Sequence, residues 1–204
     1  MIKTIFPVNI LVKDHTMPES FSKKLSSVVQ SIRHSAMLEK NISKDEITDN
    51  EVEAFTEENL TRFPELATVR DMIIDGFYDL ACSFEENILT KERITEMMST
   101  NRGKLPLMKK GDYQRLHGHA NSVAFAIFYL SDVDNEKVGG ELILKDPSFH
   151  SNSCFHPTTD FKVETKKNRL VVAPSYVWHE VTPYLGDEDR IAIVVNLEDN
   201  IILK

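Results

Sequence analysis

Three histidines of this chain could bind a metal ion together. His117 and His119 flank a single glycine, and an apolar run, residues 123–130, follows them. Side chains of a β-strand alternate between its two faces, so on a strand these two histidines would point the same way. His179 lies 60 residues further along (179 − 119 = 60) and offers a third imidazole. Imidazole binds iron, zinc, copper and nickel, so the trio predicts a metal site without choosing the metal. The alternative is three scattered surface histidines.

Arg190 is the second candidate for chemistry. It opens a stretch whose next five residues, 191–195, are all apolar. A guanidinium that is buried without a partner is costly, so Arg190 must meet an anion or reach solvent. It could bind a carboxylate inside the protein through two parallel hydrogen bonds. The alternative is an arginine at an exposed strand edge, paired with Asp187 or Glu188, and the sequence leaves both open.

The other four histidines are expected to play no part in a metal site. His34 lies off the apolar face of a predicted helix and His15 precedes that helix, so both are expected at the surface. His150 and His156 fall in the irregular segment 147–160, where no strand would hold their rings in place.

The elements that must position these residues fall into two halves. Apolar residues three and four positions apart predict helices over residues 18–38, 50–61 and 64–89, after an edge strand within residues 2–13. Beyond residue 90, short apolar stretches between turn signals predict strands over residues 94–100, 113–117, 123–129, 141–144, 161–164, 170–172, 178–181, 191–196 and 201–203. Helices followed by many short strands indicate a mostly β, α+β fold. We expect a single domain, with residues 1–90 supporting a β core over residues 91–204.

Composition narrows the class of protein. The 204 residues carry 24 basic and 32 acidic side chains, a formal charge of 24 − 32 = −8, which weighs against a nucleic-acid partner. No apolar run approaches the roughly 18 residues that cross a bilayer, and the first residues do not form a signal-peptide pattern. Cys82 sits in an apolar helical pattern and is expected to be buried, whereas Cys154 sits in a polar loop. Such cysteine usage indicates a reducing, cytoplasmic location without disulfides.

The sequence around the candidates resembles a known superfamily. Residues 110–122, 128–130, 139–142, 169–175, 178–183 and 190–193 are similar to the iron(II)/2-oxoglutarate-dependent oxygenases on their prolyl-hydroxylase side. The likeness is greatest to a small, uncharacterised bacterial and phage branch. Residues 5–8 also resemble the opening strand of that branch.

This resemblance implies a fold and a reaction. The fold would be a double-stranded β-helix, a jelly-roll or cupin-like barrel backed by N-terminal helices. Helix 64–89 would pack on the outer face of its major sheet. The reaction would use Fe(II), 2-oxoglutarate as co-substrate and O₂ to hydroxylate a C–H bond, with succinate and CO₂ as co-products.

The resemblance also implies roles for individual residues. His117 and His179 match the two iron-binding histidines, and His119 stands where most of the superfamily has Asp or Glu. Arg190 matches the base that binds the distal carboxylate of 2-oxoglutarate, and Tyr129 matches a tyrosine that hydrogen-bonds the same carboxylate. Ala192 replaces the serine of the usual Arg-x-Ser pattern, so that helper hydroxyl is missing.

Two alternatives from other classes stay open at this point. One is a three-histidine cupin dioxygenase that does not use 2-oxoglutarate, and the other is a non-catalytic metal-binding barrel. The sequence does not name the primary substrate, which could be a prolyl or other protein residue, a nucleobase or a small metabolite. It does not indicate an oligomeric state either.

Overall fold

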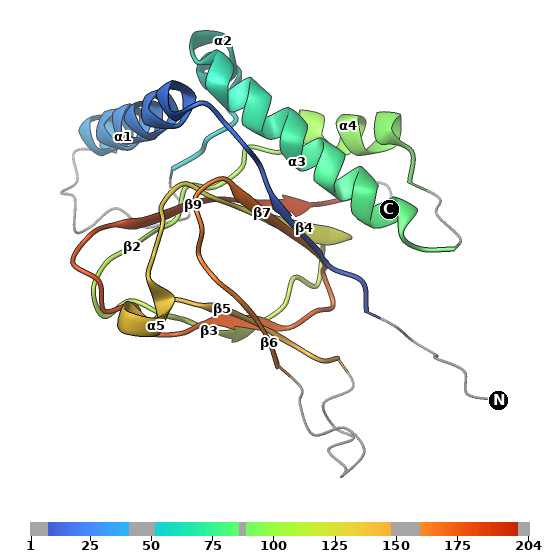
Figure 1. Cartoon of the computed structure of the whole chain (residues 1–204). Helices are drawn as coiled ribbons and strands as arrows, with labels where there is room; N and C mark the ends of the chain where they lie inside the picture. The colour runs from blue at the N-terminus through green and yellow to red at the C-terminus, as the bar shows by residue number, and fades with distance from the viewer. Residues whose placement is uncertain (1–7, 41–51, 86–88, 148–159, 200–204) are drawn as a thin grey trace.

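The computed structural model describes residues 8–40, 52–85, 89–147 and 160–199. Two antiparallel sheets face each other, and the helices within residues 19–99 lie on the outer side of the larger sheet (Figure 1). In chain order the elements are β1 (Leu11–Asp14), α1 (Glu19–Lys40), α2 (Glu57–Arg62), α3 (Pro64–Cys82), α4 (Lys91–Ser99), β2 (Leu107–Met108), β3 (Gln114–His117), β4 (Ala124–Tyr129), α5 (Asn135–Val138), β5 (Leu142–Lys145), β6 (Asp160–Val163), β7 (Arg169–Pro174), β8 (His179–Val181) and β9 (Arg190–Leu197).

The strand order confirms the predicted double-stranded β-helix. The major sheet has the order β1-β7-β4-β9-β2, and the minor sheet has the order β3-β8-β5-β6. From β2 onward the chain passes from one sheet to the other, except at β5–β6, which form a hairpin within the minor sheet. The expected edge strand is also present as β1, which pairs with β7 alone.

Alternation along the central strands separates two cores. On β4, Phe125, Ile127 and Tyr129 face the space between the sheets, whereas Ala126 and Phe128 face the helices. Strands β7 and β9 alternate in the same way, as expected for a sheet that is buried on both faces. The inner core between the sheets therefore positions the side chains that face the barrel interior.

Helix α3 covers the major sheet, as predicted, through a close approach at Gly76. A Cβ atom at this position would lie 2.5 Å from a methyl group of Leu170 and 3.1 Å from a methyl group of Val172, both on β7. The glycine lowers intrinsic helix propensity by about 1 kcal/mol relative to alanine. Its absent side chain allows the helix to pack directly on the strand.

Several expected elements differ from the structure. Residues 94–99 of the strand predicted over 94–100 belong to helix α4, and the Thr90 side chain caps this helix by accepting from the Arg93 N–H. Its buried residues Ile94, Met97 and Met98 follow a helical spacing that is too short to separate from a strand pattern. Helix α3 ends at Cys82 instead of continuing to residue 89, and the Cys82 side chain is exposed, so the expected buried thiol was wrong.

Other expectations were incomplete or concern residues outside the described part. The helix expected over residues 50–61 is the shorter α2, and the two-residue strand β2 and the one-turn helix α5 were not predicted. The strand expected over residues 201–203, together with His150, His156 and Cys154, lies outside the described residues. Within the described ranges, no helix is long and apolar enough to cross a membrane.

Candidate metal centre and co-substrate site

The structure brings the three candidate histidines together. His117 ends β3 and His179 begins β8, and the two are direct cross-strand partners. His119 lies two residues beyond β3, where its backbone N–H donates to the Ser175 carbonyl at 3.2 Å. Ligand atoms from the three imidazoles all lie within 4.8 Å of one another. The predicted cluster is thus present, while His34 is exposed and His15 is half-buried against Phe128, with 6.2 Å between ring centroids.

A β-bulge, rather than simple alternation, aims His117 into the barrel. Gln114 pairs with Val181 and His117 pairs with His179, so the step of three residues on β3 faces a step of two on β8. In a regular strand, Gln114 and His117 would point to opposite faces, and the extra residue of the bulge places them on the same face. The expectation that His117 and His119 share one strand face was therefore wrong, because His119 approaches from the following loop.

Backbone carbonyls orient two of the imidazoles. Nδ1 of His117 lies 2.7 Å from the Arg115 carbonyl oxygen, and Nδ1 of His179 lies 3.1 Å from that of Val177. A carbonyl only accepts, so each Nδ1 carries the proton and donates, which leaves Nε2 with a free lone pair. This is the usual arrangement around a metal-binding histidine.

The spacing of the nitrogens fits a common ion. The Nε2 atoms of His119 and His179 are 3.3 Å apart. Two imidazole nitrogens each about 2.1 Å from one ion, at an angle of about 90–109°, would be about 3.0–3.4 Å apart. The observed separation therefore matches two adjacent ligands of one metal ion.

Burial favours the uncharged form of two of the three imidazoles. Burial lowers the pKa of His179 to about 4, and it also lowers the pKa of His119 below its usual value, with a further contribution from the neighbouring His117. Both rings are therefore unprotonated at neutral pH, as a metal ligand requires. Phe125, which is fully buried, stacks on His179 with ring centroids 4.2 Å apart and lies 5.2 Å from His119. This ring excludes water from the inner side of the cluster.

Arg190 lies inside the barrel and not at the exposed edge that was the alternative. Arg190 is only 4% exposed. Asp187, its expected partner at an exposed edge, pairs with Lys110 at 2.8 Å. Arg190 Nε donates to the Thr165 hydroxyl at 3.2 Å, and Nη1 lies 3.1 Å from the sulfur of Met108. Nη2 has no hydrogen-bond partner among the described residues. The guanidinium is therefore buried without a counter-charge from that part of the chain.

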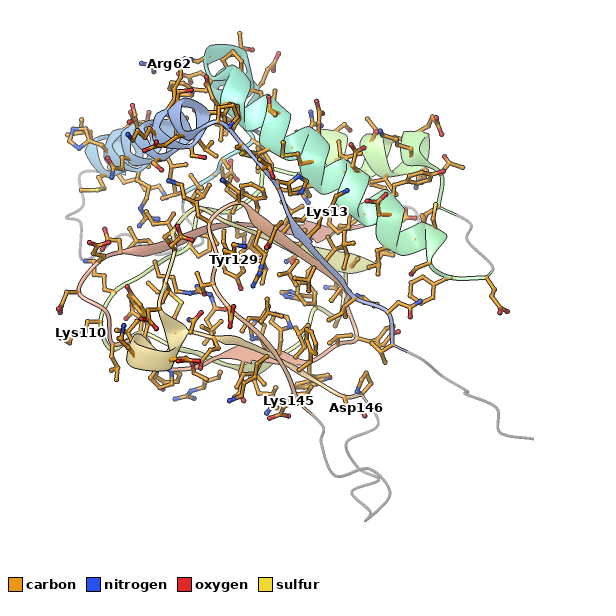
Figure 2. All side chains as sticks on the ribbon, viewed as in Figure 1. Lys13, Arg62, Lys110, Tyr129, Lys145 and Asp146 are labelled. Carbon is orange, nitrogen blue, oxygen red and sulfur yellow. The ribbon has the colours of Figure 1, made fainter. Side chains whose placement is uncertain are left out.

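Tyr129 completes an unfilled binding site beside Arg190. It lies between the two sheets (Figure 2) and is fully buried, with the guanidinium of Arg190 5.2 Å from its ring centroid. Its hydroxyl also has no hydrogen-bond partner among the described residues, and burial raises its pKa, so it remains a neutral donor. Buried polar groups are rarely left unpaired. A cation with a free N–H next to a free O–H is a site that a carboxylate would complete.

Comparison with known proteins identifies this combination. The model of the family described as "Putative 2OG-Fe(II) oxygenase" matches residues 105–196, which contain all three histidines, Tyr129 and Arg190. Over these residues the chain is similar to the iron(II)/2-oxoglutarate oxygenase superfamily. It is an oxygenase that uses Fe(II), 2-oxoglutarate and O₂. No curated protein sequence matches this oxygenase significantly.

Solved structures share the fold of this oxygenase at low identity. A Pseudomonas putida prolyl-4-hydroxylase is 17% identical, with a TM-score of 0.55 over 95% of this chain and 89% of that one. A Trichoplax adhaerens prolyl hydroxylase is 16% identical, with a TM-score of 0.60 over 94% and 84% of the two chains. A prolyl 4-hydroxylase of Phytophthora capsici is 16% identical, with a TM-score of 0.60 over 95% and 59%. The predicted prolyl-hydroxylase-like barrel is thereby confirmed.

Two residues that contact the Arg190 guanidinium, Thr165 and Met108, were not found from the sequence. Ala192 stands next to Arg190 on the same strand face and offers no hydroxyl, as expected. Thr165, which follows β6, donates to the Gly140 carbonyl and accepts from Arg190 Nε at 3.2 Å each. Met108 of β2 lies on the other side. Neither position carries a sequence signal, because the register of the folded sheets alone brings these residues to Arg190.

Proposed function

We propose that His117, His119 and His179 hold the iron of this oxygenase through Nε2, and that Arg190 and Tyr129 bind the distal carboxylate of 2-oxoglutarate. One observation supports this most strongly: the unpaired guanidinium Nη2 and the unpaired tyrosine hydroxyl lie together inside the barrel that carries the imidazole cluster. A three-histidine cupin dioxygenase would have no use for such a carboxylate site.

The chain's own residues bind, orient and exclude water. When bound, iron and 2-oxoglutarate would supply oxidation of a C–H bond by O₂, with release of succinate and CO₂. The backbone-anchored imidazoles present their lone pairs without rearrangement. Arg190 and Tyr129 would fix the co-substrate at its distal end, and Phe125 would keep water from the inner side.

His119 would make the iron site less negative than the usual one. Three neutral imidazoles with Fe²⁺ and 2-oxoglutarate²⁻ sum to zero, whereas one carboxylate ligand gives −1. The nearby carboxylates have other partners in the structure: Asp112 accepts from the Lys109 N–H, Glu141 from the Thr182 hydroxyl, and Glu180 pairs with Lys145 at 3.0 Å. We therefore propose His119 itself as the third ligand.

We further propose that the substrate is an amino-acid residue within a polypeptide. The structurally similar Trichoplax adhaerens prolyl hydroxylase was solved with a peptide fragment of hypoxia inducible factor. The shared barrel favours the same class of substrate here, with a prolyl residue as the first candidate. The cytoplasmic location indicated by the cysteines and the likeness to the bacterial and phage branch stay predictions.

Iron stoichiometry tests the ligand assignment. We expect His117→Ala and His179→Ala to lose Fe(II) when tag-free protein is loaded anaerobically and desalted, because two imidazoles form a weak site. His34→Ala is the matched control, since His34 is exposed on α1, and it should bind iron like the wild type. Full iron occupancy in both cluster variants would show that the ligands lie elsewhere.

A further inference from the structure

Strand β9 carries a polar side chain at each end of its inner face. Arg190 and Asn196 are six residues apart, so both face the space between the sheets, about 20 Å from each other. The Arg190 end is closed, because Arg190 and Tyr129 are 4% and 0% exposed. Exposure rises towards the other end, where His117 and His119 are half-buried. Within the described residues, the Asn196 end is thus the open approach to the imidazoles.

Asn196 lies beside the imidazole cluster. It pairs directly with Phe125 of β4, so the two side chains share the inner face of the major sheet. The Phe125 ring stacks on His179, and its centroid lies 5.2 Å from that of His119. The side-chain oxygen of Asn196, Oδ1, is buried and has no hydrogen-bond partner among the described residues. Such an oxygen can accept a hydrogen bond from an N–H group of the substrate.

Lys104 brings a positive charge to the same end of the barrel. Its backbone pairs with that of Val194, whose side chain packs against the inner core. Paired residues point to the same face, so the exposed Lys104 side chain also lies on the inner side of the sheet. Val194 precedes Asn196 by two residues, which makes Lys104 and Asn196 diagonal neighbours about 7–8 Å apart. A lysine side chain is long enough to reach the space beside the amide.

The charge that acts on the imidazole cluster is positive. Burial, then His117 and Lys104, lowers the pKa of His119. No acidic group of the described residues raises the pKa of His119 or of His179. Glu53 pairs with Lys104 from the opposite side, one strand further from the imidazoles. Three neutral imidazoles leave the complex of Fe²⁺ and 2-oxoglutarate²⁻ without net charge, so this end of the barrel favours a substrate with a negative charge.

We propose that Asn196 and Lys104 are specificity-determining residues, which bind a carboxylate-bearing residue of the polypeptide substrate. Asn196 Oδ1 accepts a backbone N–H of the substrate, and the Lys104 ammonium contacts the carboxylate. One lysine supplies a single positive charge, which matches a carboxylate better than a phosphate group with a charge of about −1.5 to −2. This inference rests on the proposed function, which places the oxidised C–H bond near the three histidines.

Peptide binding to the Mn(II) protein saturated with 2-oxoglutarate, measured by calorimetry, tests this inference. The probes are four blocked pentapeptides of alanine that differ only in a central aspartate, asparagine, lysine or phosphoserine. The wild type should bind the aspartate peptide about 1.5- to 5-fold more tightly than the asparagine peptide, because the contact with Lys104 is exposed. It should bind the lysine peptide more weakly still, and the phosphoserine peptide no more tightly than the aspartate peptide.

Substitutions of the two residues should have different effects. Lys104→Gln should abolish the preference for aspartate over asparagine, and Lys104→Glu should reverse it in favour of the lysine peptide. Asn196→Leu should weaken the binding of all four peptides by about 2- to 13-fold, the loss of one hydrogen bond to the backbone they share, and keep the preference. Ligand-free Asn196→Leu should be no less stable than the wild type, because Oδ1 has no partner to lose among the described residues. The 2-oxoglutarate affinity and the iron content should not change in any of these variants.

Lys110→Gln serves as the matched control. It removes the same charge, but Lys110 pairs with Asp187 near the Arg190 end, so the substitution should change no peptide affinity. A preference for aspartate that survives Lys104→Gln, or unchanged affinities in Asn196→Leu, would overturn the inference. So would a wild type that binds the aspartate and asparagine peptides equally, that prefers the lysine or phosphoserine peptide, or that binds none of the four while still binding 2-oxoglutarate. A wild type that binds no 2-oxoglutarate would instead overturn the proposed function.

Discussion

Replacing Arg190 by methionine should stabilise the ligand-free protein and abolish most of its response to 2-oxoglutarate. In the absence of ligand, the guanidinium is buried with one N–H group unsatisfied and no ion pair within the described residues. Replacing buried charged groups by apolar ones of similar volume is often neutral or stabilising by about 1–4 kcal/mol. Each kcal/mol would raise the melting temperature of a protein of this size by about 2–4 °C.

The stabilisation by 2-oxoglutarate should decrease in Arg190→Met, whereas the stability of the ligand-free protein should increase. A ligand at 100 times its Kd stabilises the folded state by about 2.7 kcal/mol. In a protein of this size, that raises the melting temperature by about 5–11 °C. Loss of a hydrogen bond to a charged group costs about 1.5–3 kcal/mol, so binding should weaken roughly 10- to 150-fold. At the same concentration the remaining stabilisation would be about 0.3–1.4 kcal/mol.

Thermal unfolding with Mn(II), in the presence and absence of 2-oxoglutarate, measures both effects. Arg169→Met is the matched control, because Arg169 donates to Asp14 at 2.7 Å and 3.1 Å on the outside of the barrel. We expect this control to be less stable than the wild type without ligand and to keep the full 2-oxoglutarate shift. An Arg190→Met variant that keeps the wild-type shift, or that is strongly destabilised without ligand, would refute the reasoning.

Four further outcomes follow from the structure. Tyr129→Phe should weaken 2-oxoglutarate binding by only about 2- to 13-fold, the loss of one net hydrogen bond of about 0.5–1.5 kcal/mol, and calorimetry with Mn(II) protein should resolve this smaller effect from that of Arg190. His119→Asp should still bind Fe(II), as measured by iron stoichiometry, since a carboxylate can replace a neutral ligand; complete loss of metal would mean that three imidazoles are required. Gly76→Ala should lower the free energy of unfolding by about 1 kcal/mol despite the better helix propensity of alanine, because the new Cβ would lie 2.5 Å from a methyl group of β7. Urea titrations measure this change, and a variant more stable than the wild type would contradict it. Hydrogen bonds from Arg169, and then from Lys166, hold the pKa of Asp14 well below its usual value. Asp14 should therefore stabilise the fold fully above pH of about 4. The stability difference between wild type and Asp14→Asn should shrink as the pH falls below that value and towards the folded-state pKa.

The sequence predicted the site better than it predicted the path of the backbone through the site. The spacing of His117 and His119 and the apolar stretch after Arg190 identified groups that the fold does bring together or bury. The stated geometry for the histidines was wrong, because β3 ends at His117 and His119 lies in the following loop. The bulge that aims His117 into the barrel depends on the register between β3 and β8, which no local alternation encodes. Thr165 and Met108 were missed for the same reason, since both reach Arg190 from distant segments.

Helix α4 shows a different limit. Three apolar residues in nine are compatible with the helical period and with the strand period, and the strand was predicted because the neighbouring sequence is rich in turn signals. The Thr90 cap was the one local signal for a helix start, and its side chain does accept the Arg93 N–H. The helical half was otherwise predicted well, because long amphipathic stretches such as α1 and α3 leave little ambiguity in the period.

A crystal structure of the anaerobic complex with Fe(II) and 2-oxoglutarate, recorded at the iron absorption edge, would test the central claim most directly. The account predicts an anomalous peak bonded to the Nε2 atoms of His117, His119 and His179, and one carboxylate of 2-oxoglutarate in contact with Arg190 and Tyr129. Iron held by other residues, or a co-substrate bound away from Arg190, would contradict it.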